Sequence, residues 1–450
     1  MQGMALCAES LTFAEMNVLV VMDSFKGSLT SRQAEEAVAE ALGQRWPGCA
    51  VTCVPISDGG EGMLGALLEA RGGQVVRVAC HDPLMRSLEA CYGIIKPSGY
   101  GREDGGDDDK DSTRPTGKGN LRPLWDVKGT NENCTEWAGE GSVNKDMYSG
   151  AIAVVEMAEA SGLSRLEAAE RNPLLTNTYG TGELIRHALD HGLRRFVVGL
   201  GGSATCDAGL GMMQALGAKL LDAEEQELPA CGGTLERVAR IDLAGLHPAL
   251  QGATPMGSAT FTMACDVSNP FTGPRGAARV FGPQKGADSA GVEALERGME
   301  HVRKLILAQT GVDLNHVAGA GAAGGLGGAF VAWLGAELRS GIDLLMDVLG
   351  LEAHIRRADL VITGEGKADR QTLMGKVPQG VLRHARRQGV PVVLMAGQVE
   401  DADMLRAAGF AQVIQVTPAP QPLAEAMRPE VARRNIAHAL AGLNPSRLIS

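Results

Sequence analysis

A glycine-rich polar turn, Gly201-Gly202-Ser203-Ala204-Thr205, is the stretch of this sequence best suited to binding an anion. It follows an apolar run at residues 196–200 that predicts a buried strand, and a helix-like pattern begins at Cys206. Glycines let the backbone approach a ligand closely, while the N–H groups of the turn and of the first helical turn point one way. The turn therefore predicts a site for phosphate or carboxylate oxygens, with an ordinary strand-to-helix turn as the alternative.

The same stretch also matches a dinucleotide-binding pattern. Residues 199–204 fit G-x-G-x-x-A, and Asp222 closes the next apolar run about twenty residues later, where a ribose-binding acid would stand. An NAD-dependent dehydrogenase is therefore an alternative. Against it, Asp207 lies at the expected helix start, where its charge would repel a pyrophosphate.

Further polar side chains follow two strands near the start of the chain. Residues 18–22 predict a strand that ends in a loop containing Asp23 and Lys26. Residues 50–56 predict a second strand, and the loop after it carries Asp58 and Glu61 before a helix that begins near residue 63. Ligands bind at the carboxyl ends of parallel strands, so these side chains are candidates for a site.

The two carboxylates of the second loop, Asp58 and Glu61, could hold Mg²⁺, which takes oxygen ligands and usually one or two carboxylates. The alternative is structural: Asp58 would cap the following helix, and Glu61 would lie in its first turn, where the helix dipole favours an acid.

The second half of the chain adds polar groups in the same kind of setting. Asp266 follows a predicted strand at residues 259–265, and Lys285 lies in a glycine- and proline-containing turn. Residues 359–363 predict a strand, residues 364–372 a polar loop with Glu365, Lys367 and Asp369, residues 377–387 a helix, and residues 390–396 another strand. This is a βαβ unit, so its strands are expected to be parallel.

Composition narrows the class of protein. The 450 residues predict two domains, and the formal net charge of −11 argues against a nucleic-acid partner. Apolar runs are too short to span a membrane, and the first residues lack the pattern of a secretory signal. Nine cysteines without a Cys-x-x-Cys pair predict reduced thiols and a cytoplasmic location. Neither a Walker motif nor a protein-kinase signature occurs.

One segment differs from the rest. Residues 98–148 are rich in glycine and acidic residues and hold hardly any aliphatic ones. Such a composition buries too little apolar surface to offset the entropy of ordering, so a disordered insertion between two neighbouring strands is expected.

Six blocks in chain order resemble the bacterial glycerate kinase family. They are DSFKGSL at 23–29, DGGEG at 58–62, TYGTGE at 178–183, GGSATCD at 201–207, FGPQKGA at 281–287, and TGEG at 363–366 with QTLMGK at 371–376. The family tends to have Asn where Cys206 stands, and it lacks the insertion at 98–148.

The resemblance implies an ATP-dependent kinase that phosphorylates D-glycerate to 2-phospho-D-glycerate with Mg²⁺, and it implies an α/β fold of two domains. One would be a discontinuous, flavodoxin-like, three-layer domain with a parallel sheet, at residues 17–80 plus 310–450. The other would be an inserted α/β domain at 81–309. Partners would be small molecules, with the chain a monomer or a homodimer.

Phosphoryl transfer needs charge neutralisation, positioning and a proton acceptor, and the residues above supply candidates for each. Gly201, Gly202, Ser203 and Thr205 would cradle phosphate. Further candidates for binding or catalysis are Lys26, Lys285, Lys367, Asp266 and Glu365. Asp207 is the first candidate for the base and Asp369 the second, and Asp58 and Glu61 would hold the metal.

Overall fold

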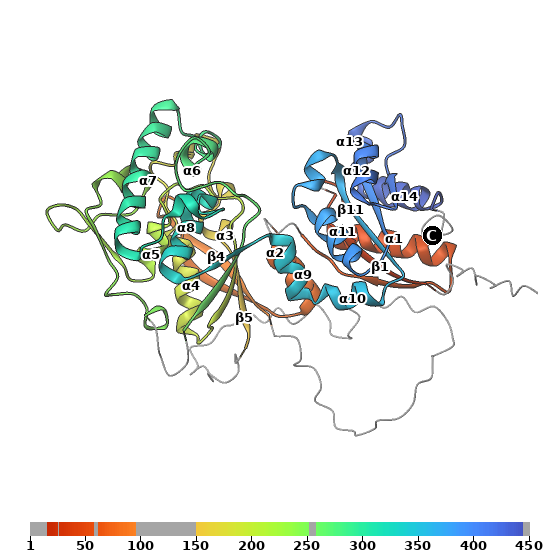
Figure 1. Cartoon of the computed structure of the whole chain (residues 1–450), viewed down its shortest axis with the longest axis horizontal. Coiled ribbons are helices and arrows are strands. Elements are labelled where there is room, and N and C mark those ends of the chain that lie inside the picture. The colour runs from red at the N-terminus through yellow and green to blue at the C-terminus, as the bar shows by residue number, and fades with distance from the viewer. Residues whose placement is uncertain (1–15, 26, 58–61, 96–149, 252–257, 444–450) are drawn as a thin grey trace, which may run out of the picture. The chain divides into compact units, whose positions relative to one another are not determined.

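The computed structural model describes residues 16–25, 27–57, 62–95, 150–251 and 258–443 (Figure 1). Contacts divide these residues into two units: unit 1 contains residues up to 57 together with 345–443, and unit 2 contains residues 62–344. The expected boundaries near residues 80 and 310 therefore differ from the observed ones. The reason is strand pairing, because β3 (Gln74–His81) pairs with β4 (Ser87–Ile95), and β10 (Glu337–Arg339) pairs with β9 (Thr260–Ala264).

Unit 1 is built on one sheet of five parallel strands in the order β13-β12-β11-β1-β2. Counted in chain order within the unit, this is 2-1-3-4-5, the flavodoxin-like order of doubly wound proteins. The strands are β1 (Asn17–Met22), β2 (Ala50–Cys53), β11 (Leu360–Ala368), β12 (Val392–Val399) and β13 (Gln412–Gln415). The helices are α1 (Ser31–Arg45), α10 (Leu351–Arg357), α11 (Val377–Arg387), α12 (Ala402–Ala408), α13 (Leu423–Ala426) and α14 (Pro429–Leu440).

The core of unit 1 follows from the alternation of side chains along the strands. Val18 and Val20 of β1 and Ile362 of β11 lie in one cluster with Val38 of α1 and Ile436 of α14. Helices α10 and α11 also contact β1, but their residues do not belong to that cluster. Helix α1 begins after Thr30, which forms a complete capping box with Gln33.

Unit 2 has a mixed sheet of six strands in the order β10-β9-β6-β5-β4-β3. Strands β5 (Ile152–Glu156), β6 (Arg195–Gly199), β9 and β10 are parallel, whereas β3, β4 and β5 are joined by antiparallel pairing. A separate two-stranded sheet joins β7 (Lys219–Leu221) and β8 (Arg240–Asp242). The helices are α2 (Met63–Arg71), α3 (Ala158–Ser161), α4 (Tyr179–Asp190), α5 (Leu210–Ala215), α6 (Ala277–Phe281), α7 (Ser289–Thr310) and α8 (Leu326–Leu334), and α9 (Gly341–Leu349) runs across the unit boundary.

The antiparallel pairing of β4 with β5 confirms that the insertion joins neighbouring strands. Residues 98–148 themselves lie outside the described residues, so their expected disorder stays a prediction. No helix in the described part of the chain combines the length and apolar character that crossing a membrane requires.

Two predicted elements have different bounds in the structure. Helix α5 begins at Leu210 rather than at Cys206, because Ala208 and Gly209 adopt positive φ angles of 58° and 73°, which no α-helix tolerates. Strand β11 continues to Ala368, through residues expected to form a loop, since it pairs with β12 as far as Val399. The mixed α/β class with parallel strands is confirmed.

Candidate active site

The glycine turn of unit 2 follows β6 and exposes its backbone donors. Gly202 is exposed and has a φ of +73°, the left-handed region that favours glycine. Among the described residues, the backbone N–H groups of Gly201, Gly202 and Ser203 donate to no protein acceptor. Consecutive N–H groups left without acceptors are a common feature of anion-binding loops. Because α5 has only six residues and starts later, the donors are those of the turn itself and not of a helix N-terminus.

Lys285 supplies a buried positive charge directly behind this turn. It ends the short 3₁₀ helix Pro283–Lys285, and 2 % of its surface is exposed. Its Nζ donates to Ser203 Oγ and to the Thr205 carbonyl oxygen, both at 2.7 Å. Burial lowers the pKa of Lys285 to about 8, because desolvation disfavours the ammonium. Within the described residues no carboxylate forms an ion pair with this nitrogen, and the nearby charge of Asp207 only partly opposes the effect of burial on its pKa, so an anion at the turn would add a direct counter-charge.

Asp207 lies next to the turn but is completely enclosed. Its Oδ2 accepts hydrogen bonds from the backbone N–H of Thr178 at 2.7 Å, from Thr178 Oγ1 at 2.8 Å and from the N–H of Gly211 at 3.1 Å. Its Oδ1 accepts from the N–H of Gly209 at 3.1 Å. Burial raises the pKa of Asp207, whereas these hydrogen bonds oppose the shift. The contacts favour a structural role at the start of α5, and the role of base stays a prediction.

A further glycine-rich stretch, residues 319–324, contacts the loop that contains Thr205 through Gly324. A Cβ on Gly324 would overlap the carbonyl oxygen of Thr205, and Gly324 has a φ of +69°. A Cβ on Gly321 would overlap the carbonyl oxygen of Pro270. These glycines are required by close backbone approach, and they fix the position of Thr205. The hydroxyl of Thr205 is buried and has no hydrogen-bond partner in the described part of the chain.

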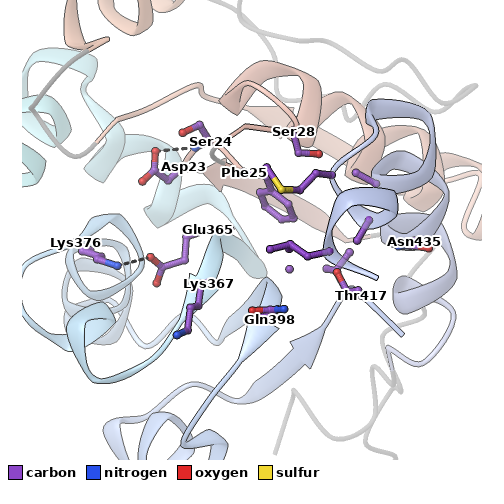
Figure 2. A pocket seen from close by; sticks show the side chains of 17 residues that line it. Asp23, Ser24, Phe25, Ser28, Glu365, Lys367, Lys376, Gln398, Thr417 and Asn435 are labelled. Atoms are coloured by element: carbon purple, nitrogen blue, oxygen red, sulfur yellow. Dashed lines mark hydrogen bonds and ion pairs between the residues drawn. The ribbon is translucent and has the colours of Figure 1, made fainter. Parts of the chain in front are cut away.

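In unit 1, charged residues gather where β1 and β11 end. Figure 2 shows Asp23, Glu365, Lys376 and Lys367 near one end of a pocket. Glu365 is buried, and its carboxylate accepts from Thr372 Oγ1 at 2.6 Å and from Lys376 Nζ at 3.0 Å. Asp23 is also buried and accepts from the N–H of Ser24 at 2.7 Å. The parallel pairing of β1 with β11 brings these carboxylates to one edge of the sheet.

Lys367 and Asp369 lie beside that pocket. Lys367 Nζ is 2.9 Å from Glu400 and 3.8 Å from Asp369. The hydrogen bond with Glu400 raises the pKa of Lys367, so this lysine is a cation at neutral pH. Asp369 caps the 3₁₀ helix Arg370–Leu373 by accepting from the N–H of Gln371 at 2.8 Å.

The structure thus brings the predicted residues together in two sets. Gly201, Gly202, Ser203, Thr205, Asp207 and Lys285 lie together in unit 2, and Glu365, Lys367 and Asp369 lie together in unit 1. Asp266, in unit 2, accepts from the N–H of Gly341 at 2.9 Å at the start of α9. Lys26, Asp58 and Glu61 lie outside the described residues.

Three residues of the site region were not singled out from the sequence as candidates. Thr178 holds Asp207, and Glu400 holds Lys367. Glu156 ends the buried strand β5 and accepts from the N–H groups of Gly62, at 3.3 Å, and Leu64, at 2.6 Å, at the start of α2. In the sequence, a glutamate directly after an apolar run could have identified Glu156 as a candidate.

The dinucleotide interpretation does not agree with the topology. In a dinucleotide-binding fold, the acid that binds ribose ends a strand parallel and adjacent to the first strand. Asp222 instead follows β7, which pairs with β8 in a separate antiparallel sheet. Its carboxylate accepts from the N–H groups of Glu224 and Gln226, as the first residue of a turn does.

Glycine turns and polar side chains at the carboxyl ends of parallel strands, present in both units, are the arrangement in which α/β proteins bind small-molecule ligands. A model of the glycerate kinase family matches residues 18–101 and 103–444. The chain belongs to this family, and it is therefore a kinase.

Individual relatives agree. The glycerate 2-kinase of Escherichia coli (strain K12) is 37 % identical over 432 residues, which cover 95 % of this chain and 98 % of the relative. The glycerate kinase of Bacillus subtilis (strain 168) is 36 % identical over 412 residues, 91 % of this chain and 93 % of the relative. A crystal structure of a protein assigned as glycerate kinase 2 of Salmonella typhimurium LT2 superposes with a TM-score of 0.73 at 37 % identity, over 95 % of this chain and 98 % of that one.

Proposed function

We propose that this kinase transfers a phosphoryl group from ATP to D-glycerate, with Mg²⁺, and that the product is 2-phospho-D-glycerate. The choice of hydroxyl is supported by the Escherichia coli relative, which is described as a glycerate 2-kinase. The observation that carries the proposal in the structure is the glycine turn at 201–203, with its unpaired N–H groups and Lys285 behind it.

The turn suits an oxygen anion for two reasons. Backbone N–H groups fixed by the fold need no reorganisation when charge arrives, which makes them effective in phosphoryl transfer. Lys285 adds a positive charge that desolvation makes costly when it is unpaired, so an anion bound at the turn relieves that cost. We propose that the turn and Ser203 bind the carboxylate of glycerate or the transferred phosphate, with Lys285 positioning Ser203 and Thr205.

The remaining roles follow from the charged set in unit 1. Lys367 is proposed to balance phosphate charge, and Asp369, 3.8 Å from it, is proposed as the acceptor of the hydroxyl proton. Asp207 remains the other proposed acceptor, although its four hydrogen bonds leave it little capacity. Lys26 is proposed as a further cation, and Glu365 and Asp266 as binding residues.

Magnesium would neutralise phosphate charge, and Asp58 and Glu61 are proposed to hold it. The described residues contain no group of three or more His, Cys, Asp or Glu side chains that could hold a metal. This agrees with the usual behaviour of Mg²⁺, which binds through one or two carboxylates and completes its shell with water and phosphate oxygens.

The test is product analysis. D-Glycerate and MgATP are incubated with the protein, and the proton-coupled phosphorus NMR spectrum of the product is recorded. Phosphate on the 2-hydroxyl is attached to a carbon with one hydrogen and gives a doublet, whereas phosphate on the 3-hydroxyl gives a triplet. A triplet would refute the assigned position, and the absence of any ATP-dependent product would refute the proposed activity.

A further inference from the structure

A pocket in unit 1 combines an apolar interior with a charged end. Its cavity volume is about 380 Å³, and it opens where β1, β11, β12 and β13 end. The apolar wall comes from distant parts of the chain: Phe25, Val416, Leu423, Ala426, Met427 and Ala432. Figure 2 shows the charged side chains near one end, and Thr417 and Asn435 on the opposite side.

The position of the pocket is the one that open parallel sheets use for ligands. In the order β13-β12-β11-β1-β2, the chain moves to one side of β1 for β2 and to the other side for β11. The crevice at the carboxyl ends of the strands beside such a switch point is where ligands bind in doubly wound folds. Asp23 and Ser24 follow β1, and Glu365 and Gly366 belong to β11, so the pocket lies at this switch point.

The lining selects an occupant that is flat, largely apolar and uncharged. Glycerate carries an oxygen on each of its three carbons and offers almost no apolar surface to Phe25 or Met427. A phosphate is disfavoured in the apolar interior, because the only cations among the described lining residues, Lys367 and Lys376, lie at the charged end, where each pairs with a glutamate. A heterocyclic base has the required apolar faces, and a cavity of this size is typical of small-molecule sites lined by apolar groups with a few polar ones.

The polar groups of the pocket fit the edge of a base. Gln398 presents an amide and Thr417 presents a hydroxyl, whereas the amide of the buried Asn435 already donates to Gln421 Oε1 at 2.7 Å. Amides offer a donor and an acceptor side by side, as the edge of a purine does. Leu423 adds a second indication, since 59 % of this apolar side chain is exposed at the pocket, and a bound base would cover it.

We propose that this pocket binds the purine base of the nucleotide donor, between Phe25, Leu423 and Met427, with its polar edge toward Gln398 and Thr417. The proposal rests on the proposed function in that the donor is ATP. It assigns the base to unit 1.

The experiment uses the full-length protein and two pocket variants. Ala426→Leu fills the cavity, and Leu423→Ser removes an exposed apolar contact without disturbing the core. The matched controls are Ala407→Leu, an exposed alanine of α12, and Leu307→Ser, a part-exposed leucine of α7. Calorimetric titration with adenosine and with ADP measures base binding directly, and steady-state kinetics with pyrophosphate as inhibitor measure phosphate binding.

We expect both pocket variants to weaken the affinity for adenosine and for ADP by about tenfold or more, through a lost apolar contact in Leu423→Ser and through a filled cavity in Ala426→Leu. Inhibition by pyrophosphate and the KM for glycerate should stay as in the wild type, and both controls should match the wild type throughout. Unchanged adenosine affinity in both pocket variants would overturn the assignment, and so would a rise in the KM for glycerate alone. If the wild type bound adenosine in this pocket but phosphorylated no glycerate, the proposed function would fail while this assignment stood.

Discussion

Replacing Lys285 by methionine tests whether burial of this ammonium makes its charged form costly in folded unit 2. Burial lowers the pKa of Lys285 to about 8, against about 10.5 in an unfolded chain. Below pH 8 the lysine is protonated in both states. Between the two pKa values the folded protein has released the proton and the unfolded chain still holds it, so the stability of the folded state rises with pH.

The size of the effect follows from these two pKa values. Between pH 7 and pH 10, Lys285 should add about 2.5 kcal/mol to the free energy of unfolding of the wild type. In Lys285→Met this gain is absent. The measurement is the free energy of unfolding of unit 2 from denaturant titrations at both pH values, for wild type and variant, so that other titrating groups cancel. Lys304→Met is the matched control, because 68 % of the Lys304 side chain is exposed.

Identical pH dependence in the wild type and in Lys285→Met would refute the reasoning, because it would mean that burial does not perturb this ammonium. The same variant reports on the anion site. If the turn at 201–203 binds glycerate or phosphate with help from Lys285, kcat/KM in the wild type falls as pH rises through about 8, and Lys285→Met is low at every pH.

Three further outcomes follow. Asp207→Asn should lower the free energy of unfolding by about 1–3 kcal/mol, and with it the melting temperature, because the amide group would face N–H donors. A lowered kcat with an unchanged melting temperature would instead support the role of base. Gly324→Ala should destabilise unit 2 and weaken anion binding, since the Cβ would overlap the Thr205 carbonyl group, and Gly43→Ala, with open space around it, is the control; calorimetry and thermal melts would contradict this if both variants matched the wild type. Deletion of residues 98–148 should leave kcat and the melting temperature nearly unchanged, because β4 and β5 are neighbours that a short turn can join; a large loss of either would show that the segment contributes to the fold or the site.

Much of the fold could be predicted because local patterns and tertiary structure agree. The strands β1 and β6 lie where their apolar runs predict them. The start of α5 could not be predicted, because the positive φ of Ala208 depends on contacts with Gly324, more than a hundred residues away. The extension of β11 likewise depends on β12 as a partner, which overrides the glycines in its sequence.

The site was predictable as a set of residue types but not as a geometry. Lys285 stood out because it lies in a glycine–proline turn, yet its contact with Ser203 joins residues 82 apart in the chain. Nothing local in the sequence of residues 416–435 indicates a pocket wall. They form one only because residues of α13 and α14 meet residues of β11 and β12 in the folded unit. Apolar residues in amphipathic helices are normally core residues, so sequence patterns give such a wall no distinguishing signal.

The pairing of β1 with β11 also determines the order in which this protein can fold during synthesis. Met22 ends β1 and Leu360 begins the adjacent strand β11, and the described residues of unit 2 are translated between them. At usual elongation rates the ribosome needs roughly 20–70 s to cover that distance. The described residues of unit 2 all lie between β2 and β11 in the sequence and can fold as they emerge, whereas β1 and β2 must wait for β11 to complete their sheet. Limited proteolysis of ribosome-arrested chains of increasing length should therefore detect a protected unit 2 first, and unit 1 only after β11 and β12 have emerged.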